Sequence, residues 1–146
     1  MAKADVSTTI KRPVEDVFAV LSNPENSPKW SSSALDSKKT SEGPIGVGTT
    51  SRSVSKFLGR RIESESEITE FEPNRKFAAH SKSGPFPFQA TVTFERIEGG
   101  TRVNVTIEAE PGGFFKLAEP LIVSMAKRQF QSDFDNLKDL MEANAL

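Results

Sequence analysis

Residues 120–143 read PLIVSMAKRQFQSDFDNLKDLMEA, and this stretch decides what the rest of the chain must provide. Four of its apolar residues follow one another at spacings of four, three and four, which places them on one face of an α-helix: Phe130, Phe134, Leu137 and Met141. A helix over Pro120–Ala143 would be roughly 36 Å long at ~1.5 Å per residue. A helix of this length needs a large apolar surface to lie against, so we expect the preceding residues to form one.

The length of 146 residues predicts one domain that spans residues 1–146. The net charge of −1 and the pI near 5.9 do not indicate binding to nucleic acid or to an anionic membrane. There is no cysteine and only one histidine, so we expect no disulfide and no thiolate or histidine metal site. The chain shows neither a signal peptide nor the ~20 apolar residues of a membrane-spanning helix. We therefore expect a cytoplasmic protein without metal or cofactor, although a metal site made of carboxylates alone stays open.

The hydrophobic pattern predicts the element order β-α-α-β-β-β-β-β-β-α. The first helix starts at Pro13 and has apolar residues at helical spacing from Val14 to Leu21. A second, short helix starts at Asn23 and ends at Trp30. The strands are predicted over Lys3–Ile10, Ser31–Thr40, Thr49–Phe57, Arg61–Phe71, Arg75–Ser81, Phe88–Ile97 and Thr101–Ala109.

The last two strands form a hairpin in this scheme, with Gly99-Gly100 as a two-residue turn. The face that results is apolar and pairs Phe94 with Val105, Val92 with Ile107, and Ala90 with Ala109. Polar side chains fill the opposite face. The pattern therefore predicts a sheet with an apolar inner face and a polar outer face.

The strands over Thr49–Phe57 and Arg61–Phe71 depart from this pattern. One face sets Arg52 and Lys56 against a row of glutamates, so we expect it to face solvent. The other face should then face the core, yet it carries five serines: Ser51, Ser53, Ser55, Ser64 and Ser66. Serines fill little volume, and their hydroxyls need hydrogen-bond partners. A change of parity near Thr69–Glu70 also predicts a bulge that would curve the sheet.

Two interpretations of the serine face stay open. In the first, the small hydroxylated residues line a cavity that holds water or a ligand. An empty apolar void of roughly 300 Å³ would cost roughly 7 kcal/mol at ~24 cal/mol per Å³, which is comparable to the whole stability of a domain, about 5–15 kcal/mol. In the second interpretation, the serines belong to a solvated hairpin and there is no pocket.

Several short segments, spread over nearly the whole chain, share their order and spacing with a known superfamily: Ile10–Phe18, Leu21–Asn26 with Trp30, Gly46–Thr49, Phe71–Arg75, Phe94-Glu95 and Leu137–Glu142. In these segments the chain resembles the START-like superfamily, also called SRPBCC or Bet v 1-like. The resemblance is greatest to its polyketide cyclase/dehydrase branch.

The resemblance implies an α+β helix-grip fold, in which a curved seven-stranded antiparallel sheet wraps a long C-terminal helix. Two short helices after the first strand close one end. It also implies a hydrophobic cavity between helix and sheet. It does not imply one activity, because members include lipid and hormone binders as well as polyketide aromatase/cyclases. The serine-rich hairpin is not a hallmark of the superfamily.

Several side chains are candidates for chemistry, each with an alternative. His80 titrates near neutral pH, but the register places it on the outer face opposite Glu67, so we interpret it as a surface residue rather than a catalytic one. Lys127 could anchor an anionic group. Trp30 either packs at the mouth of the cavity or closes the core beneath the short helices.

A cluster of apolar residues is interpreted as a ligand portal, with a homodimer contact or burial under a loop as alternatives: Phe86, Phe88, Phe114, Phe115, Leu117, Leu121 and Met125.

We predict that the chain binds a small hydrophobic molecule, lipid or polyketide-like, between the sheet and the C-terminal helix. The alternatives are a polyketide aromatase/cyclase or dehydratase and a protein-interaction module. The inward faces contain no Glu, Asp, His or Tyr in this scheme, so no catalytic residue is assigned and an enzyme is less favoured. The predicted ligand-binding residues are Trp30, Phe57, Ser64, Ser66, Phe77, Ala79, Phe88, Ala90, Val92, Val123, Lys127 and Phe130.

Overall fold

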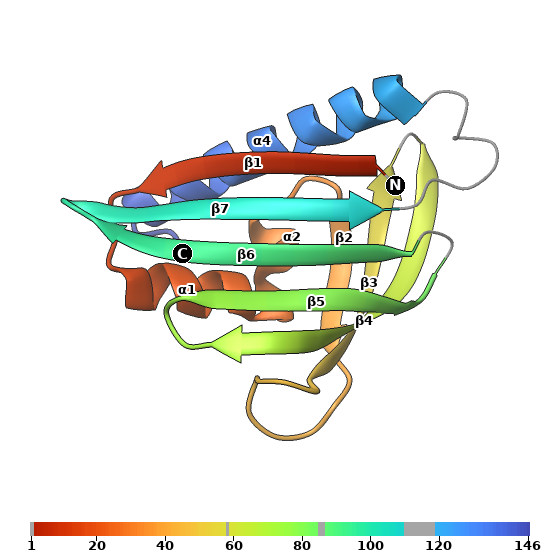
Figure 1. Ribbon diagram of the computed structural model, residues 1–146, viewed down its shortest axis with the longest axis horizontal. Coiled ribbons are helices and arrows are strands. Elements are labelled where there is room, and N and C mark those ends of the chain that lie inside the picture. The colour runs from red at the N-terminus through yellow and green to blue at the C-terminus, as the bar shows by residue number, and fades with distance from the viewer. Residues whose placement is uncertain (1, 58, 85–86, 110–118) are drawn as a thin grey trace.

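The computed structural model describes residues 2–57, 59–84, 87–109 and 119–146, and its centre is a curved antiparallel sheet of seven strands (Figure 1). The strands lie in the order β1-β7-β6-β5-β4-β3-β2, so consecutive strands are neighbours except that β1 pairs with β7. Their bounds are β1 Ala2–Ile10, β2 Ala34–Lys39, β3 Thr50–Phe57, β4 Arg60–Glu72, β5 Lys76–Ser83, β6 Phe88–Ile97 and β7 Gly100–Ala109.

The helices lie on the inner side of this sheet. They are α1 Val14–Ser22, the 3-10 turn η1 Pro24–Asn26, α2 Ser27–Trp30 and the long α4 Glu119–Glu142. α4 runs along β1, and α1 packs against β6 and β7 (Figure 1). The predicted long helix differs from α4 by one residue at each end, and the predicted helix-grip architecture is confirmed.

The core lies at the end of the sheet that α1 covers. Phe18 of α1 makes edge-to-face contacts with Phe71 and Phe94, with ring centroids 5.2 and 5.1 Å apart. Val103 and Val17 are fully buried beside them. The alternating pattern of the strands and the helical pattern of α1 therefore meet in one cluster.

The two halves of α4 have different surroundings. Leu137 and Met141, near its C-terminus, are fully buried, and Phe134 is nearly so. Leu121 is 64% exposed and Met125 is 40% exposed near its N-terminus. The predicted apolar stripe thus packs in the second half of the helix, whereas the first half leaves large apolar side chains in solvent.

The β4–β5 pair contains the predicted bulge. Its register shifts between Ile68 and Glu70, which leaves Thr69 as the extra residue. The turn that joins the two strands at Pro73-Asn74 is also as predicted, and Asn74 adopts a positive φ of 63°. A bulge increases the local twist of a strand, and it helps the sheet to curl around α4.

The predicted register of the β6–β7 hairpin is wrong by two residues. Ile97 pairs with Gly100, so the turn is Glu98-Gly99, where Gly99 has a φ of 81°. Because the shift is even, every residue keeps its predicted face. The inward pairs are Phe94 with Val103, Val92 with Val105, Ala90 with Ile107, and Phe88 with Ala109.

Gly100 is the first residue of β7, and the end of β1 lies close against it. A Cβ at this position would be 2.3 Å from the carbonyl oxygen of Ile10. We expect Gly100→Ala to lower the free energy of unfolding by about 2 kcal/mol, since the backbone of β1 has to move. Urea denaturation measures the change. Gly46→Ala is the matched control, because a Cβ there meets nothing within 4 Å; equal losses in the two variants would contradict the steric reason.

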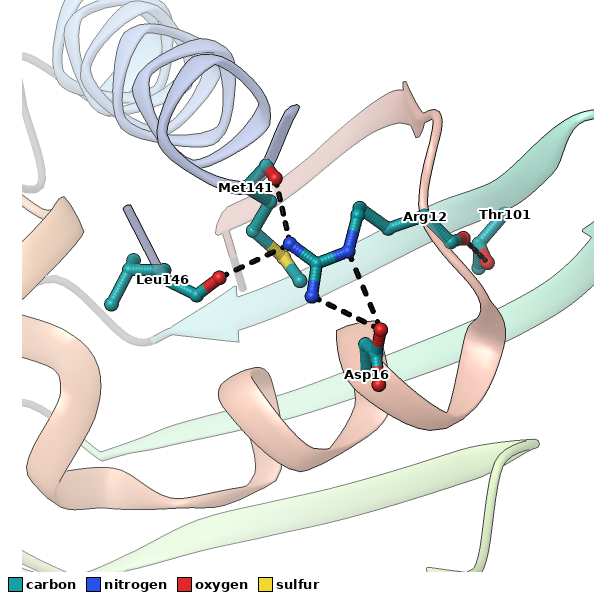
Figure 2. A network of polar contacts seen from close by, with 5 residues as sticks. All are labelled: Arg12, Asp16, Thr101, Met141 and Leu146. Carbon is teal, nitrogen blue, oxygen red and sulfur yellow. Dashed lines mark hydrogen bonds and ion pairs between the residues drawn. The ribbon is translucent and has the colours of Figure 1, made fainter. Parts of the chain in front are cut away.

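Arg12 joins the β1–α1 loop to the C-terminal end of α4 (Figure 2). Its Nη1 donates to the carbonyl oxygens of Met141 at 2.7 Å and Leu146 at 3.2 Å. Its Nε and Nη2 donate to the Asp16 carboxylate, while its own carbonyl oxygen accepts a hydrogen bond from Thr101 Oγ1. One guanidinium therefore links the start of α1 to the last turn of α4 and to the residue Leu146 that follows the helix.

Glu142 strengthens the same junction. Its carboxylate accepts hydrogen bonds from Lys138 Nζ and from the backbone N–H of Lys11. The Lys138 ammonium, followed by the Lys11 N–H, lowers the pKa of Glu142 below its ordinary value. Lys138 Nζ also donates to the carbonyl oxygen of Thr9 at 2.8 Å, so the last turns of α4 are held to the end of β1.

We expect Arg12→Ala to destabilise the protein by about 1–3 kcal/mol, because charged hydrogen bonds to two carbonyls and one carboxylate are lost. Thermal or urea unfolding followed by circular dichroism measures the loss. Arg75→Ala is the control, since Arg75 is exposed in the β4–β5 turn. A loss below about 0.5 kcal/mol for Arg12→Ala would show that the network contributes little.

Candidate ligand-binding face

The register brings most of the predicted ligand-binding residues onto the inner face of the sheet. Ser53 pairs with Ser64, Ser51 with Ser66, and Ala79 with Ala90. Phe77 pairs with Val92, and Phe88 with Ala109. Because paired residues share a face, the predicted set from β4, β5 and β6 lies on the concave side: Ser64, Ser66, Phe77, Ala79, Phe88, Ala90 and Val92.

This inner face has a covered part and an accessible part. At the α1 end, inward residues such as Val92 and Val105 are buried. Toward the other end, many inward residues keep partial exposure although they face the helix side, and seven of them lie side by side on β3 to β6: Ser51, Ser53, Ser64, Ser66, Ala79, Phe88 and Ala90. We call these seven residues the open face. In the described part of the chain α4 packs mainly on β1 and α2, so it leaves the open face uncovered.

The predicted residues outside the sheet lie in different surroundings. Val123 and Phe130 of α4 are partly buried, and Lys127 is exposed. Trp30 of α2 is partly buried against the core, and its ring lies 5.1 Å from that of Phe134. Their roles in binding stay predictions.

Some predictions fall outside the described residues. They concern Phe86, Phe114, Phe115 and Leu117 of the predicted portal, and Leu58 of the β3–β4 turn. The strand position of Phe57 is described but its side chain is not.

Serine pairs cross the open face. Ser51 Oγ and Ser66 Oγ are 3.1 Å apart and share a hydrogen bond, and Ser53 Oγ and Ser64 Oγ do the same at 3.1 Å. Ser81 Oγ accepts a hydrogen bond from the backbone N–H of Phe88 at 2.9 Å. Because these hydroxyls are hydrogen-bonded, the strands can turn a serine-rich face inward without leaving polar groups unpaired.

The outer face of the same strands carries charges, as predicted. Arg52 Nη2 lies 2.9 Å from Glu63, and this guanidinium lowers the pKa of the Glu63 carboxyl. His80 pairs with Glu67 across β4 and β5, with Nε2 3.8 Å from the carboxylate. His80 is exposed, which agrees with its interpretation as a surface residue.

Asp133 is a buried carboxylate that the sequence analysis missed. Its side chain on α4 is only 3% exposed. Its oxygens accept hydrogen bonds from Ser31 Oγ at 2.8 Å, Ser32 N and Ser32 Oγ at 3.1 Å each, and Gln129 Nε2 at 2.9 Å. Ser31 and Ser32 therefore fold toward α4, and β2 starts at Ala34 instead of the predicted Ser31.

A signal for Asp133 was present in the helical pattern. It follows Phe130 by three residues and precedes Leu137 by four, which is core-side spacing on a helix. The nearby serines supply the donors that make its burial tolerable. The contacts with Ser31 and Ser32 bind α4 to the α2–β2 loop, so the role of Asp133 in the structure is to hold the helix.

We expect Asp133→Asn to destabilise the protein by about 1–3 kcal/mol, because an amide N–H2 would replace one acceptor and face the serine donors. Chemical denaturation measures the effect. Asp135→Asn is the matched control, since Asp135 is exposed on the same helix and accepts only from Gln131. Similar stabilities of the two variants would contradict an anchoring role for Asp133.

The described residues contain neither a membrane-spanning helix nor a cluster of metal ligands. No helix among them is long and apolar enough to cross a membrane. Within residues 2–57, 59–84, 87–109 and 119–146, no three metal-ligating side chains gather in a way that would hold a metal ion.

Comparisons with known proteins identify the family. The family model described as "Polyketide cyclase / dehydrase and lipid transport" matches residues 1–142. The chain therefore belongs to the polyketide cyclase/dehydrase and lipid transport family. A comparison with curated proteins finds no significant match.

Solved structures show the same fold at low sequence identity. The crystal structure of TTHA0849 from Thermus thermophilus has a TM-score of 0.85 and 20% identity, with 99% of each chain covered. A START superfamily protein from Mycobacterium smegmatis has a TM-score of 0.72 and 12% identity, covering 99% of this chain and 97% of that one. The di-domain ARO/CYC BexL from the BE-7585A biosynthetic pathway has a TM-score of 0.75 and 16% identity, covering 97% of this chain and 47% of that one.

Proposed function

We propose that the protein binds a small hydrophobic molecule on the open face, with the N-terminal half of α4 as the opposite wall. The observation that carries this proposal is the partial exposure of inward residues on a sheet whose core end is fully packed. A folded domain normally covers its inner face, because each buried CH₂ group contributes about 0.8 kcal/mol. An accessible inner face is therefore available to a ligand.

The centre of the open face is small and uncharged. Ala79 and Ala90 pair directly and form a shallow floor, with Phe88 beside Ala90 on the same face of β6. Val123 and Phe130 on α4 provide apolar side chains that are themselves only partly buried. Concave, largely apolar surfaces with a few polar groups are typical of small-molecule sites.

The family supports this proposal, because its description includes lipid transport. The di-domain ARO/CYC protein of a biosynthetic pathway shares the fold, and it supports the alternative of a polyketide cyclase. That alternative requires an acid or base that reaches the ligand. Asp133 is the buried carboxylate among the described residues, and its oxygens are engaged by serine and glutamine donors. We therefore favour binding over catalysis.

The exposed pair Leu121 and Met125 favours a second candidate, a protein-interaction surface, since these residues lie one turn apart on α4. A homodimer through this pair would appear in the mass measured by size-exclusion light scattering. Leu121→Ser/Met125→Ser would then restore the monomer. The cytoplasmic location expected from the sequence stays a prediction.

We expect Ala90→Trp to weaken binding of the neutral fluorescent probe N-phenyl-1-naphthylamine at least ten-fold, because the indole would occupy the centre of the open face. A fluorescence titration measures the Kd, and ten-fold corresponds to about 1.4 kcal/mol. Thr91→Trp is the matched control, because the next residue of β6 points to the outer face. It should change the Kd less than two-fold. Equal effects of the two variants, or no binding by the wild type, would refute the proposal.

A further inference from the structure

We propose that the polar part of the ligand is neutral and rich in oxygen, such as a sugar or polyol, and that it binds along a set of inward serines. This set, the serine ladder, consists of Ser37, Ser51, Ser53, Ser64, Ser66 and Ser81. The inference rests on the proposed function, and it adds the chemical class of the ligand at the same site.

The ladder forms a grid across four strands. One row runs Ser37–Ser53–Ser64 over β2, β3 and β4, and the other runs Ser51–Ser66–Ser81 over β3, β4 and β5. Strand geometry sets the rows about 6.8 Å apart along a strand, with about 4.8 Å between neighbouring strands. Several oxygens of one small ligand would therefore find hydroxyls on the same face.

Each serine pair leaves one hydroxyl hydrogen unused. Each hydroxyl has one donor and two acceptor sites. In the pairs Ser51–Ser66 and Ser53–Ser64, one hydrogen joins the two oxygens, so the second hydroxyl hydrogen of each pair is free. Ser81 accepts from the backbone N–H of Phe88, and its own hydrogen has no acceptor among the described residues. The ladder therefore offers donors to acceptor oxygens of a ligand.

Two side chains at the β2 end also offer donors without a partner among the described residues. Trp30 Nε1 is buried and has no hydrogen-bond partner there. Ser37 pairs with Ser53 on the inner face, and its hydroxyl makes no hydrogen bond to a described residue. The two side chains come from neighbouring elements, because α2 packs against β2. A buried donor without an acceptor is unfavourable, so an oxygen from outside the chain would be stabilised at Trp30 Nε1.

The inward residues of β3 and β4 carry no charge. Between Ser51 and Ser55, and between Ile62 and Ile68, every inward residue is uncharged. The charged side chains of these strands, such as Arg52 and Glu63, lie on the outer face. Lys39 of the edge strand pairs with Ser51 and is the cation next to the ladder, and its ammonium donates to the carbonyl oxygen of Gly43. An anionic head group over β3 and β4 would lose hydration without meeting a cation on these strands, whereas neutral oxygens only need donors.

Three amphiphiles with alkyl chains of nearly equal length test the inference: n-decyl β-glucopyranoside, decanoate and n-decylphosphocholine, each below its critical micelle concentration. Displacement of N-phenyl-1-naphthylamine measures their affinities. We expect the wild-type protein to bind the glucoside at least ten-fold more tightly than the other two. Equal affinities, or tighter binding of decanoate, would overturn the inference.

Removal of one serine pair gives the second readout. We expect Ser53→Ala/Ser64→Ala to weaken glucoside binding about five-fold to ten-fold, as the loss of one or two hydrogen bonds predicts, and to change decanoate binding less than two-fold. Ser7→Ala is the control, because Ser7 is exposed and pairs with Asn104 on the outer face. The single variants Ser53→Ala and Ser64→Ala serve if the double variant does not fold.

The outcomes separate the two proposals. If the wild type does not bind the naphthylamine probe, the proposed function fails. If it binds the probe but shows no preference for the glucoside, or if the serine variants bind the glucoside as well as the wild type does, only the inference about the polar part fails.

Discussion

The last turns of α4 are held by burial and by charge at the same point. Leu137 and Met141 are fully buried, and the Arg12 guanidinium donates to the carbonyl oxygen of Met141. A helix is stiff, so fixing its last turns sets the direction of the turns that precede them. This includes Leu121, which lies about 30 Å from Met141 at ~1.5 Å per residue. Asp133 adds an attachment to the α2–β2 loop midway along the helix. The N-terminal half of α4 is therefore positioned mainly by contacts made elsewhere.

This arrangement divides the inner face of the sheet. The end beneath α1 is filled by Phe18, Phe94 and their neighbours, which supply the hydrophobic stabilisation of the fold. The other end has mostly small residues, and serine hydroxyls that already pair with one another. The residues that stabilise the fold and the residues that we propose to bind a ligand therefore lie at different ends of one continuous face. Variants of the open face should consequently affect binding more than folding.

Much of this was predictable because strand and helix periods are local properties. The spacing of Phe130, Phe134, Leu137 and Met141 predicted the buried face of α4, and alternation predicted the inner faces of β3 to β7. The turn at Glu98-Gly99 was not predicted, since the choice between adjacent glycines depends on the carbonyl of Ile10 in a distant strand. The burial of Ala78 was not predictable from local patterns either. Parity places it on the outer face opposite Glu70, yet it is 1% exposed.

The sequence by itself determined the family, the helix-grip architecture and the direction in which the residues of β3 to β7 point, because these follow from short-range patterns and their order. It also revealed the unusual serines of β3 and β4. Only the tertiary structure decided which end of the inner face is covered, that Asp133 is buried, and that Ser37 and Trp30 keep donors without partners among the described residues. Coverage and hydrogen-bond pairing depend on segments far apart in the chain, and local periodicity carries no information about which of them meet.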